Sequence, residues 1–165
     1  MENNKYVKVH NLLRMFAVLL AIAVFIGMFA AKQAICPDDA LAKYVFVDFK
    51  NGAFFGDDAY DYGNIPAFIG YILVLLGGLA GLAFVFIDEM IGKDLTKKLS
   101  FVAGGLMLLG ALFIFLTGVF FRAFNSDGVG IKNYHLAAAP IVFGILGAVA
   151  GACNVAAPIL EDKGL

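Results

Sequence analysis

Four long apolar segments constrain what this chain can fold into more than any other feature of its sequence. A helix needs about 20 apolar residues to cross the hydrocarbon core of a bilayer. Four segments reach roughly that length: Leu12 to Ala31, Pro66 to Ile87, Leu99 to Phe121 and Leu136 to Leu160. Because no water is available inside the bilayer, each segment must satisfy its own backbone hydrogen bonds, which favours helices. The sequence therefore predicts an all-α membrane protein built on a four-helix transmembrane bundle.

The composition favours a single membrane domain over residues 1–165. Hydrophobic residues make up 62% of the chain and charged residues 15%, whereas roughly a quarter of the residues in soluble proteins are charged. The net charge of −1 provides no basic field that would gather nucleic acid. The lipid bilayer is therefore the expected environment, and no nucleic acid is expected as a partner.

The apolar segments lack the groups that mark most ion paths, proton relays and substrate sites, which are ionisable side chains inside the membrane. Arg14 is the one charged residue in the four segments, and it lies in the first turn, where its stem can reach the headgroups. Thr117 and Asn154 are the main polar candidates for burial. Serine occurs only at positions 100 and 126, which does not support a Ser-His-Asp hydrolase. We predict a non-enzymatic protein without a cofactor.

The first apolar segment is more typical of a signal anchor than of a cleaved signal peptide. Lys5, Lys8 and Arg14 precede an apolar run of 17 residues, and no clean A-x-A cleavage site follows it. The core of a signal peptide is usually shorter, about 7–15 residues. We expect the segment to be retained, with a cleaved peptide as the alternative.

The positive residues predict the orientation in the membrane. The two tails and the connection between the second and third segments carry seven Lys and Arg residues, and the other side carries five. Of those five, Lys43 and Lys50 lie well within the long insert between the first and second segments, where charge has less influence on topology. We therefore predict a multi-pass protein of the cell (plasma) membrane, with both termini in the cytoplasm and residues 32–65 outside the cell.

The extracellular insert has strand character. Residues 44–49, YVFVDF, are β-branched and aromatic, and the Asn-Gly pair that follows at 51–52 suits a tight turn. This pattern predicts a small extracellular β-hairpin over about residues 44–55. Its apolar face either packs on the helices below, because a lone hairpin is marginally stable, or leaves an edge that recruits another protein. The candidates for partner binding are Tyr44, Phe46, Phe49, Phe54 and Phe55.

An acidic stretch follows the predicted hairpin. Asp57, Asp58 and Asp61 lie within five residues, and carboxylate oxygens are ligands that hard cations prefer. Their spacing does not match an EF-hand loop. We expect a solvated acidic loop, and these residues are weak candidates for a metal site.

Small residues recur where helices would touch. Lipid tails already solvate large apolar side chains, so close helix association depends on glycine and alanine. We expect these glycines to pack the bundle, with a homo-oligomer face as the alternative. The candidates for helix packing are Gly77, Gly81, Gly104, Gly105, Gly144, Gly147 and Gly151.

The order of these features resembles the claudin and peripheral-myelin-protein type of four-span membrane protein. In both, a large first outer segment with strand character follows one span, and three closely spaced spans complete the chain. The resemblance covers nearly the whole chain at the level of layout. The family's Trp and Cys-pair signature is missing, since the chain has no Trp and Cys36 is the one cysteine in the insert, so no family residue is carried over. The layout is also similar to uncharacterised bacterial four-span proteins. The resemblance implies the fold and an adhesive or organising role.

The leading hypothesis is therefore a non-enzymatic tetraspan protein that organises or associates with other membrane components through its outer loop. One alternative is a small transporter or channel, or an accessory subunit of a membrane complex. The polar material for a transport path would be Asp88, Glu89, Thr117 and Asn154. Another alternative is a protein that binds a lipid or a quinone beside the Phe-rich end of the third segment.

Overall fold

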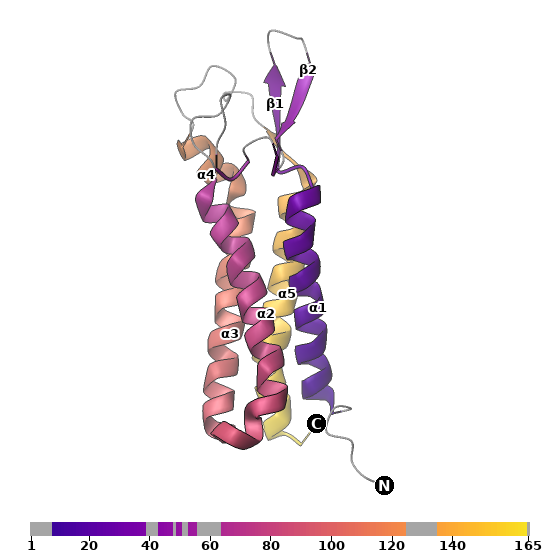
Figure 1. Cartoon of the computed structure of the whole chain (residues 1–165), viewed down its shortest axis with the longest axis vertical. Helices are drawn as coiled ribbons and strands as arrows, with labels where there is room; N and C mark the ends of the chain where they lie inside the picture. The colour runs from indigo at the N-terminus through magenta and orange to yellow at the C-terminus, as the bar shows by residue number, and fades with distance from the viewer. Residues whose placement is uncertain are drawn as a thin grey trace.

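The computed structural model of the chain is a bundle of four long antiparallel helices with a small sheet at one end (Figure 1). It describes residues 8–38, 43–47, 49–50, 53–55, 64–124 and 135–164. The four long helices are α1 (Val9–Ala30), α2 (Ile65–Ile91), α3 (Lys93–Phe115) and α5 (Ala138–Asp162). The smaller elements are α4 (Thr117–Phe124), β1 (Ala34–Asp38), β2 (Lys43–Val47) and β3 (His135–Leu136).

The long helices form a four-cornered bundle in which α1 and α3 each pack against α2 and α5. The first and last described residues lie at the same end, which we call the base, together with the turn between α2 and α3 (Figure 1). The strands and α4 lie at the opposite end, which we call the sheet end. Helices α1 and α3 therefore lie diagonally opposite each other, and a side chain of α1 that contacts α3 must extend through the interior of the bundle.

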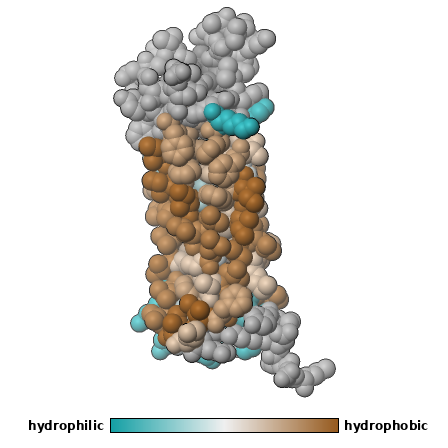
Figure 2. All heavy atoms as spheres, viewed as in Figure 1, coloured by the Kyte–Doolittle hydropathy of each residue, from teal (hydrophilic) through white to brown (hydrophobic). Residues whose placement is uncertain are grey.

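The surface of the helices is apolar. Large hydrophobic side chains point outward on all four sides, for example Leu19, Leu76, Leu112 and Ile145, each at least half exposed. Figure 2 shows the resulting hydrophobic band between the two ends of the molecule. Each long helix is long and apolar enough to cross a membrane. The chain is a multi-pass membrane protein, as its sequence predicts.

The third apolar segment is not one helix, in contrast to the predicted span from Leu99 to Phe121. Helix α3 ends at Phe115, Leu116 breaks it, and α4 starts at Thr117. The hydroxyl of Thr117 donates to the carbonyl of Ile114 at 2.6 Å, and the carbonyl of Thr117 accepts from the side-chain amide of Asn64 at 2.8 Å. Such local side-chain bonds compete with a regular helix. The hydropathy of the segment is continuous, so it cannot reveal the break.

The predicted hairpin over residues 44–55 is wrong. Strand β2 pairs antiparallel with β1, which precedes it, in the register Ala34↔Val47 to Asp38↔Lys43. Ala53–Phe55 forms a turn instead of a return strand. Residues 51 and 52, the predicted turn, lie outside the described part of the chain.

Two features explain this correction. The partner strand β1 ends at Asp38, five residues before β2 begins at Lys43, so the two strands are close in the chain. Proline usually indicates that a segment is not a central strand, and Pro37 made β1 difficult to recognise. Strand β3 pairs with β1 only at Ala34 and Ile35, so Pro37 lies where β1 has a neighbour on one side. The all-α bundle stands, but the sheet joins residues from both ends of the chain.

Candidate functional site

The most unusual group in the bundle is a buried arginine at the base. Arg14 is 1% exposed, although its place in the first segment predicts a side chain that reaches the headgroups. It follows His10 and Asn11 by one helical turn, and both of these are also buried. Residues at this spacing share one face of a helix, and here that face turns into the bundle. An ionisable group therefore lies inside the bundle, contrary to the sequence-based expectation.

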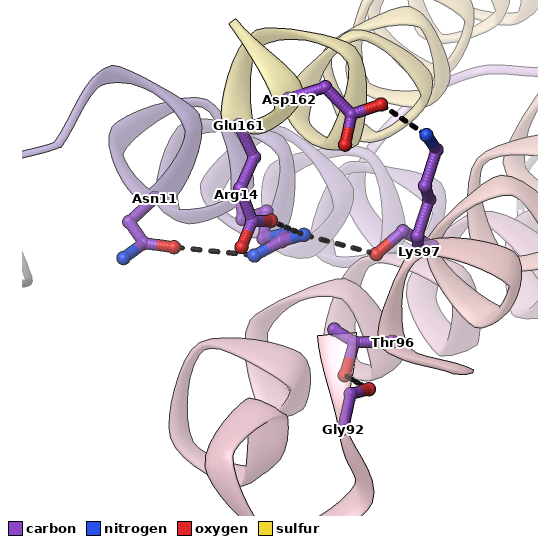
Figure 3. Close-up of polar contacts among 8 residues, drawn as sticks. Asn11, Arg14, Gly92, Thr96, Lys97, Glu161 and Asp162 are labelled. Carbon is purple, nitrogen blue, oxygen red and sulfur yellow. Dashed lines mark hydrogen bonds and ion pairs between the residues drawn. The ribbon is translucent and has the colours of Figure 1, made fainter. Parts of the chain in front are cut away.

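The guanidinium of Arg14 joins three helices (Figure 3). Its Nη1 donates to Oδ1 of Asn11 at 3.3 Å. Its Nη2 donates to Oγ of Ser100 on α3 and to Oε2 of Glu161 on α5, each at 3.3 Å. The Nε–H is buried and has no hydrogen-bond acceptor among the described residues. We call Asn11, Arg14, Ser100 and Glu161 the Arg14 cluster.

The Arg14 cluster opens toward the base through Glu161, whose side chain is 23% exposed. Next to it, Lys97 of α3 and Asp162 of α5 form a more exposed ion pair (Figure 3). Thr96, the residue before Lys97, is buried, and its hydroxyl donates to the carbonyl of Gly92 at 3.1 Å. Chemically, the cluster pairs a buried guanidinium with the partly exposed carboxylate of Glu161.

Asn154 is a second buried polar group, in the middle of the bundle. It is fully buried, and its Nδ2 donates to the carbonyl of Gly77 at 3.2 Å and to the sulfur of Met107 at 3.1 Å. Its Oδ1 has no donor among the described residues. A side chain at Gly81 would collide with this amide. The glycine at this position therefore makes room for a polar contact between α2 and α5.

Thr117 and Asn154 are both buried, and each bonds to backbone of its own or a neighbouring helix. Asp88 and Glu89 fall within α2, but their side chains lie outside the described part of the structure.

An aromatic layer closes the bundle at the sheet end. Phe54 is 1% exposed, with its ring centroid 5.8 Å from those of Phe68 and Tyr71. The hydroxyl of Tyr71 donates to Oε1 of Gln33 at 3.0 Å, and Gln33 donates in turn to the carbonyl of Ala31 at 3.3 Å. The layer thus ties the start of α2 to the residues that connect α1 with β1.

The candidates for partner binding have different environments. Phe54 belongs to the buried layer, where side chains of this chain cover it, and Phe49 is half-buried against Phe29. Phe55 is 59% exposed. The side chains of Tyr44 and Phe46 fall outside the described structure, although their backbone forms part of β2. The candidate metal ligands Asp57, Asp58 and Asp61 also lie outside the described residues.

Six of the seven candidate packing glycines lie against another helix. A side chain at Gly104 would approach Val155 to 2.6 Å and the carbonyl of Gly151 to 3.0 Å. Gly105 is exposed and has no neighbour within 4 Å. The other contacts are Gly77 with Met107, Gly81 with Asn154, Gly144 with Phe115, Gly147 with Val74 and Ala111, and Gly151 with Leu108.

Sequence reasoning missed the Arg14 cluster because its members lie far apart in the chain. One signal was present, since His10, Asn11 and Arg14 share a helix face and recur at helical spacing. No comparable signal marks Ser100 or Glu161, which reach Arg14 only after α3 and α5 pack. The described residues contain no group of three or more His, Cys, Asp or Glu side chains placed to hold a metal ion.

Comparison with known proteins does not assign this chain to a family. No model of a known protein family matches the sequence, and a search among curated proteins finds no significant match.

Proposed function

We propose that this protein is a non-enzymatic tetraspan protein of the plasma membrane that recruits another membrane protein through its sheet end. The observation that carries the proposal is the outer edge of β2, which pairs with no strand among the described residues. The strand order is β2-β1-β3, so β2 has β1 on one side and no described strand on the other. An open edge offers unpaired backbone N–H and C=O groups to an extended segment of a partner.

The position of the edge favours a partner outside the bilayer. The strands β1 and β2 extend beyond the ends of the helices, along the long axis of the bundle (Figure 1). A segment that pairs with β2 would therefore lie in water. There, water can solvate the free backbone groups of the edge, and a partner strand can still replace that water.

The edge is also held in place by the bundle. Strand β1 pairs with β3 next to the start of α5, with Ile35 opposite His135. The N–H of Ala137 donates to the carbonyl of Gln33 at 3.2 Å. Below the sheet, the buried ring of Phe54 packs on α2. A preorganised edge loses less conformational entropy when a partner binds.

The distribution of lysines supports a cytoplasmic base and an extracellular sheet end. Five exposed or half-exposed lysines lie at the base: Lys8, Lys93, Lys97, Lys98 and Lys163. The sheet end has fewer basic residues among those described. Lysine-rich ends of membrane helices tend to stay in the cytoplasm. The resemblance to claudin-type proteins implies the same layout, with a cytoplasmic base and an extracellular sheet end.

A photo-crosslinking experiment in native membranes tests the proposed partner site. Benzoylphenylalanine would be placed at Tyr44 or Phe46 on β2 and, as a control, at Leu112, which is 50% exposed on the lipid-facing side of α3. We expect a protein adduct of defined mass at the β2 positions and only lipid adducts at Leu112. Lipid adducts alone at both β2 positions would refute a partner at this edge.

A small transporter is a second candidate, because Asn154 and Arg14 place polar groups at two depths inside the bundle. Buried polar groups are the usual material of transport paths. The support is weaker than for partner binding, since Asn154 is enclosed by Met107 and the glycines of α2. Flux of small ions in proteoliposomes, abolished by Asn154→Leu, would favour this candidate over the first.

A further inference from the structure

We propose that the Arg14 cluster is a binding site for a phosphate group, which enters from the base and takes the place of Glu161. The group belongs either to the headgroup of an anionic lipid or to free phosphate, because the chemistry that recognises it is the same. This inference is independent of the partner proposed for β2, which lies at the other end of the bundle.

The first step concerns charge. A guanidinium is permanently charged, and a buried charge is costly unless an opposite charge and hydrogen bonds compensate it. Among the described residues, Glu161 supplies the one carboxylate bonded to Arg14. When Glu161 moves away, another anion must replace it. The cluster is therefore a site that always requires an anion, and Glu161 is the resident one.

The second step concerns geometry. Charge-assisted hydrogen bonds from nitrogen to oxygen are usually about 2.7–2.9 Å long, whereas all three bonds of Arg14 measure 3.3 Å. Glu161 offers only Oε2, and only to Nη2. The Nε–H lies on the same edge of the guanidinium as Nη2 and is unpaired. An anion that presents two oxygens to this edge would satisfy both donors, which is how Arg commonly binds phosphate.

The third step concerns access. Glu161 lies in the last turn of α5 and is 23% exposed, so its side chain can turn into water without movement of the helix. Arg14 is five residues from the start of α1, which corresponds to about 7 Å along a helix. The polar layer on each side of a bilayer is about 5–7 Å thick. A lipid phosphate therefore comes close to the depth of Arg14.

The surroundings also favour an anion with several oxygens. The hydroxyl of Ser100 accepts one bond from Arg14 and keeps its own proton for an oxygen of the ligand. Lys97 at the mouth of the site is 39% exposed and is paired with Asp162, so its charge there is already compensated. A phosphate that enters would thus have the guanidinium of Arg14 and the hydroxyl of Ser100 as donors within the cluster.

The test compares two single-charge variants of the full chain by native mass spectrometry in detergent, with phosphatidylglycerol and phosphatidylcholine as probes. Glu161→Gln removes the resident anion. Asp162→Asn is the matched control, since it removes one negative charge from the adjacent residue but leaves Arg14 paired. We expect phosphatidylglycerol to bind Glu161→Gln about fivefold or more tightly than the natural protein, within the range usual for coupled sites. Asp162→Asn frees Lys97 at the mouth of the site but leaves Arg14 paired with Glu161, so its gain in affinity should be clearly smaller than that of Glu161→Gln.

Further measurements show whether Arg14 is the residue that binds the anion, and whether the anion is a lipid headgroup or free phosphate. Arg14→Gln in the Glu161→Gln background should remove the gain, and if that double variant does not fold, the comparison of Glu161→Gln with Asp162→Asn still decides. Competition by millimolar inorganic phosphate would indicate free phosphate as the ligand. Binding of phosphatidylglycerol that phosphate does not displace would indicate the lipid. The proposal is overturned if Glu161→Gln binds neither probe more tightly than Asp162→Asn does.

Discussion

At the scale of single residues, this bundle depends on a few polar side chains that its apolar sequence makes easy to overlook. Arg14 and Asn154 are both buried, and each has one polar atom without a partner among the described residues. Apart from the bond of Arg14 to Asn11 within α1, their other bonds run between helices, from α1 to α3 and α5 and from α5 to α2 and α3. Interhelical polar bonds in membranes contribute about 0.6–2 kcal/mol each. These contacts therefore select which helices meet.

Gly81 provides a prediction at this scale. Gly81→Ala should destabilise the bundle by about 1–3 kcal/mol, the usual cost of overpacking, because its new methyl group would meet the amide of Asn154. Gly105→Ala is the control, since nothing lies within 4 Å of that position, and it should be neutral or stabilising by up to about 1 kcal/mol. Unfolding in a titration with sodium dodecyl sulfate measures both.

A double variant checks the cause. Adding Asn154→Ala to Gly81→Ala removes the amide that the methyl group would meet, so the pair should be non-additive. Equal stability of Gly81→Ala and Gly105→Ala would contradict the structure at this contact.

At the scale of elements, the sheet end is joined to the helices by side chains as well as by the chain itself. The turn Ala53–Phe55 directs Phe54 into the aromatic layer while Phe55 stays exposed. Asn64 starts α2 by accepting a bond from the N–H of Ala67 at 3.2 Å, and it also bonds the start of α4. The sheet, α2 and α4 are therefore coupled at one level of the molecule.

Phe54→Ala tests this coupling. Removal of a buried Phe usually costs about 3–5 kcal/mol, and here the loss should fall on the sheet end, because the helices keep their own contacts. We expect proteases to cleave within residues 32–64 faster than in the natural protein, while α1 and α5 stay protected. Intact-mass analysis of the fragments measures the rate and the position of cleavage. The neighbouring Phe55→Ala is the control and should leave the cleavage rate nearly unchanged, since Phe55 is 59% exposed. Similar rates for the two variants would argue against a structural role for Phe54.

At the scale of the whole molecule, an even number of long helices brings both described ends of the chain to the base (Figure 1). The proposed phosphate site and the proposed partner edge therefore face opposite sides of the membrane. A ligand at the base and a partner at the sheet end would be separated by the length of the bundle.

We predict that the sheet end lies outside the cell and the base in the cytoplasm. In a background with Cys36 and Cys153 replaced, single cysteines would be introduced at Lys50, at the sheet end, and at Lys163, at the base; both positions are exposed. A membrane-impermeant maleimide should label Lys50→Cys on intact cells and Lys163→Cys only after permeabilisation. The reverse pattern would invert the proposed orientation and place the β2 edge in the cytoplasm.

The sequence by itself determined the environment, the number of long helices and their approximate positions, because hydrophobicity and length decide what can cross a bilayer. Small residues such as Gly77 and Gly147 were recognisable as packing candidates for a similarly local reason. Only the tertiary structure decided that β2 pairs with β1, that Leu116 interrupts the third segment, and that Arg14 turns inward. The last two of these depend on groups distant in the chain: Asn64 with Thr117, and Ser100 and Glu161 with Arg14. Hydropathy is a property of one segment, whereas the partner of a polar group is decided by which helices pack together.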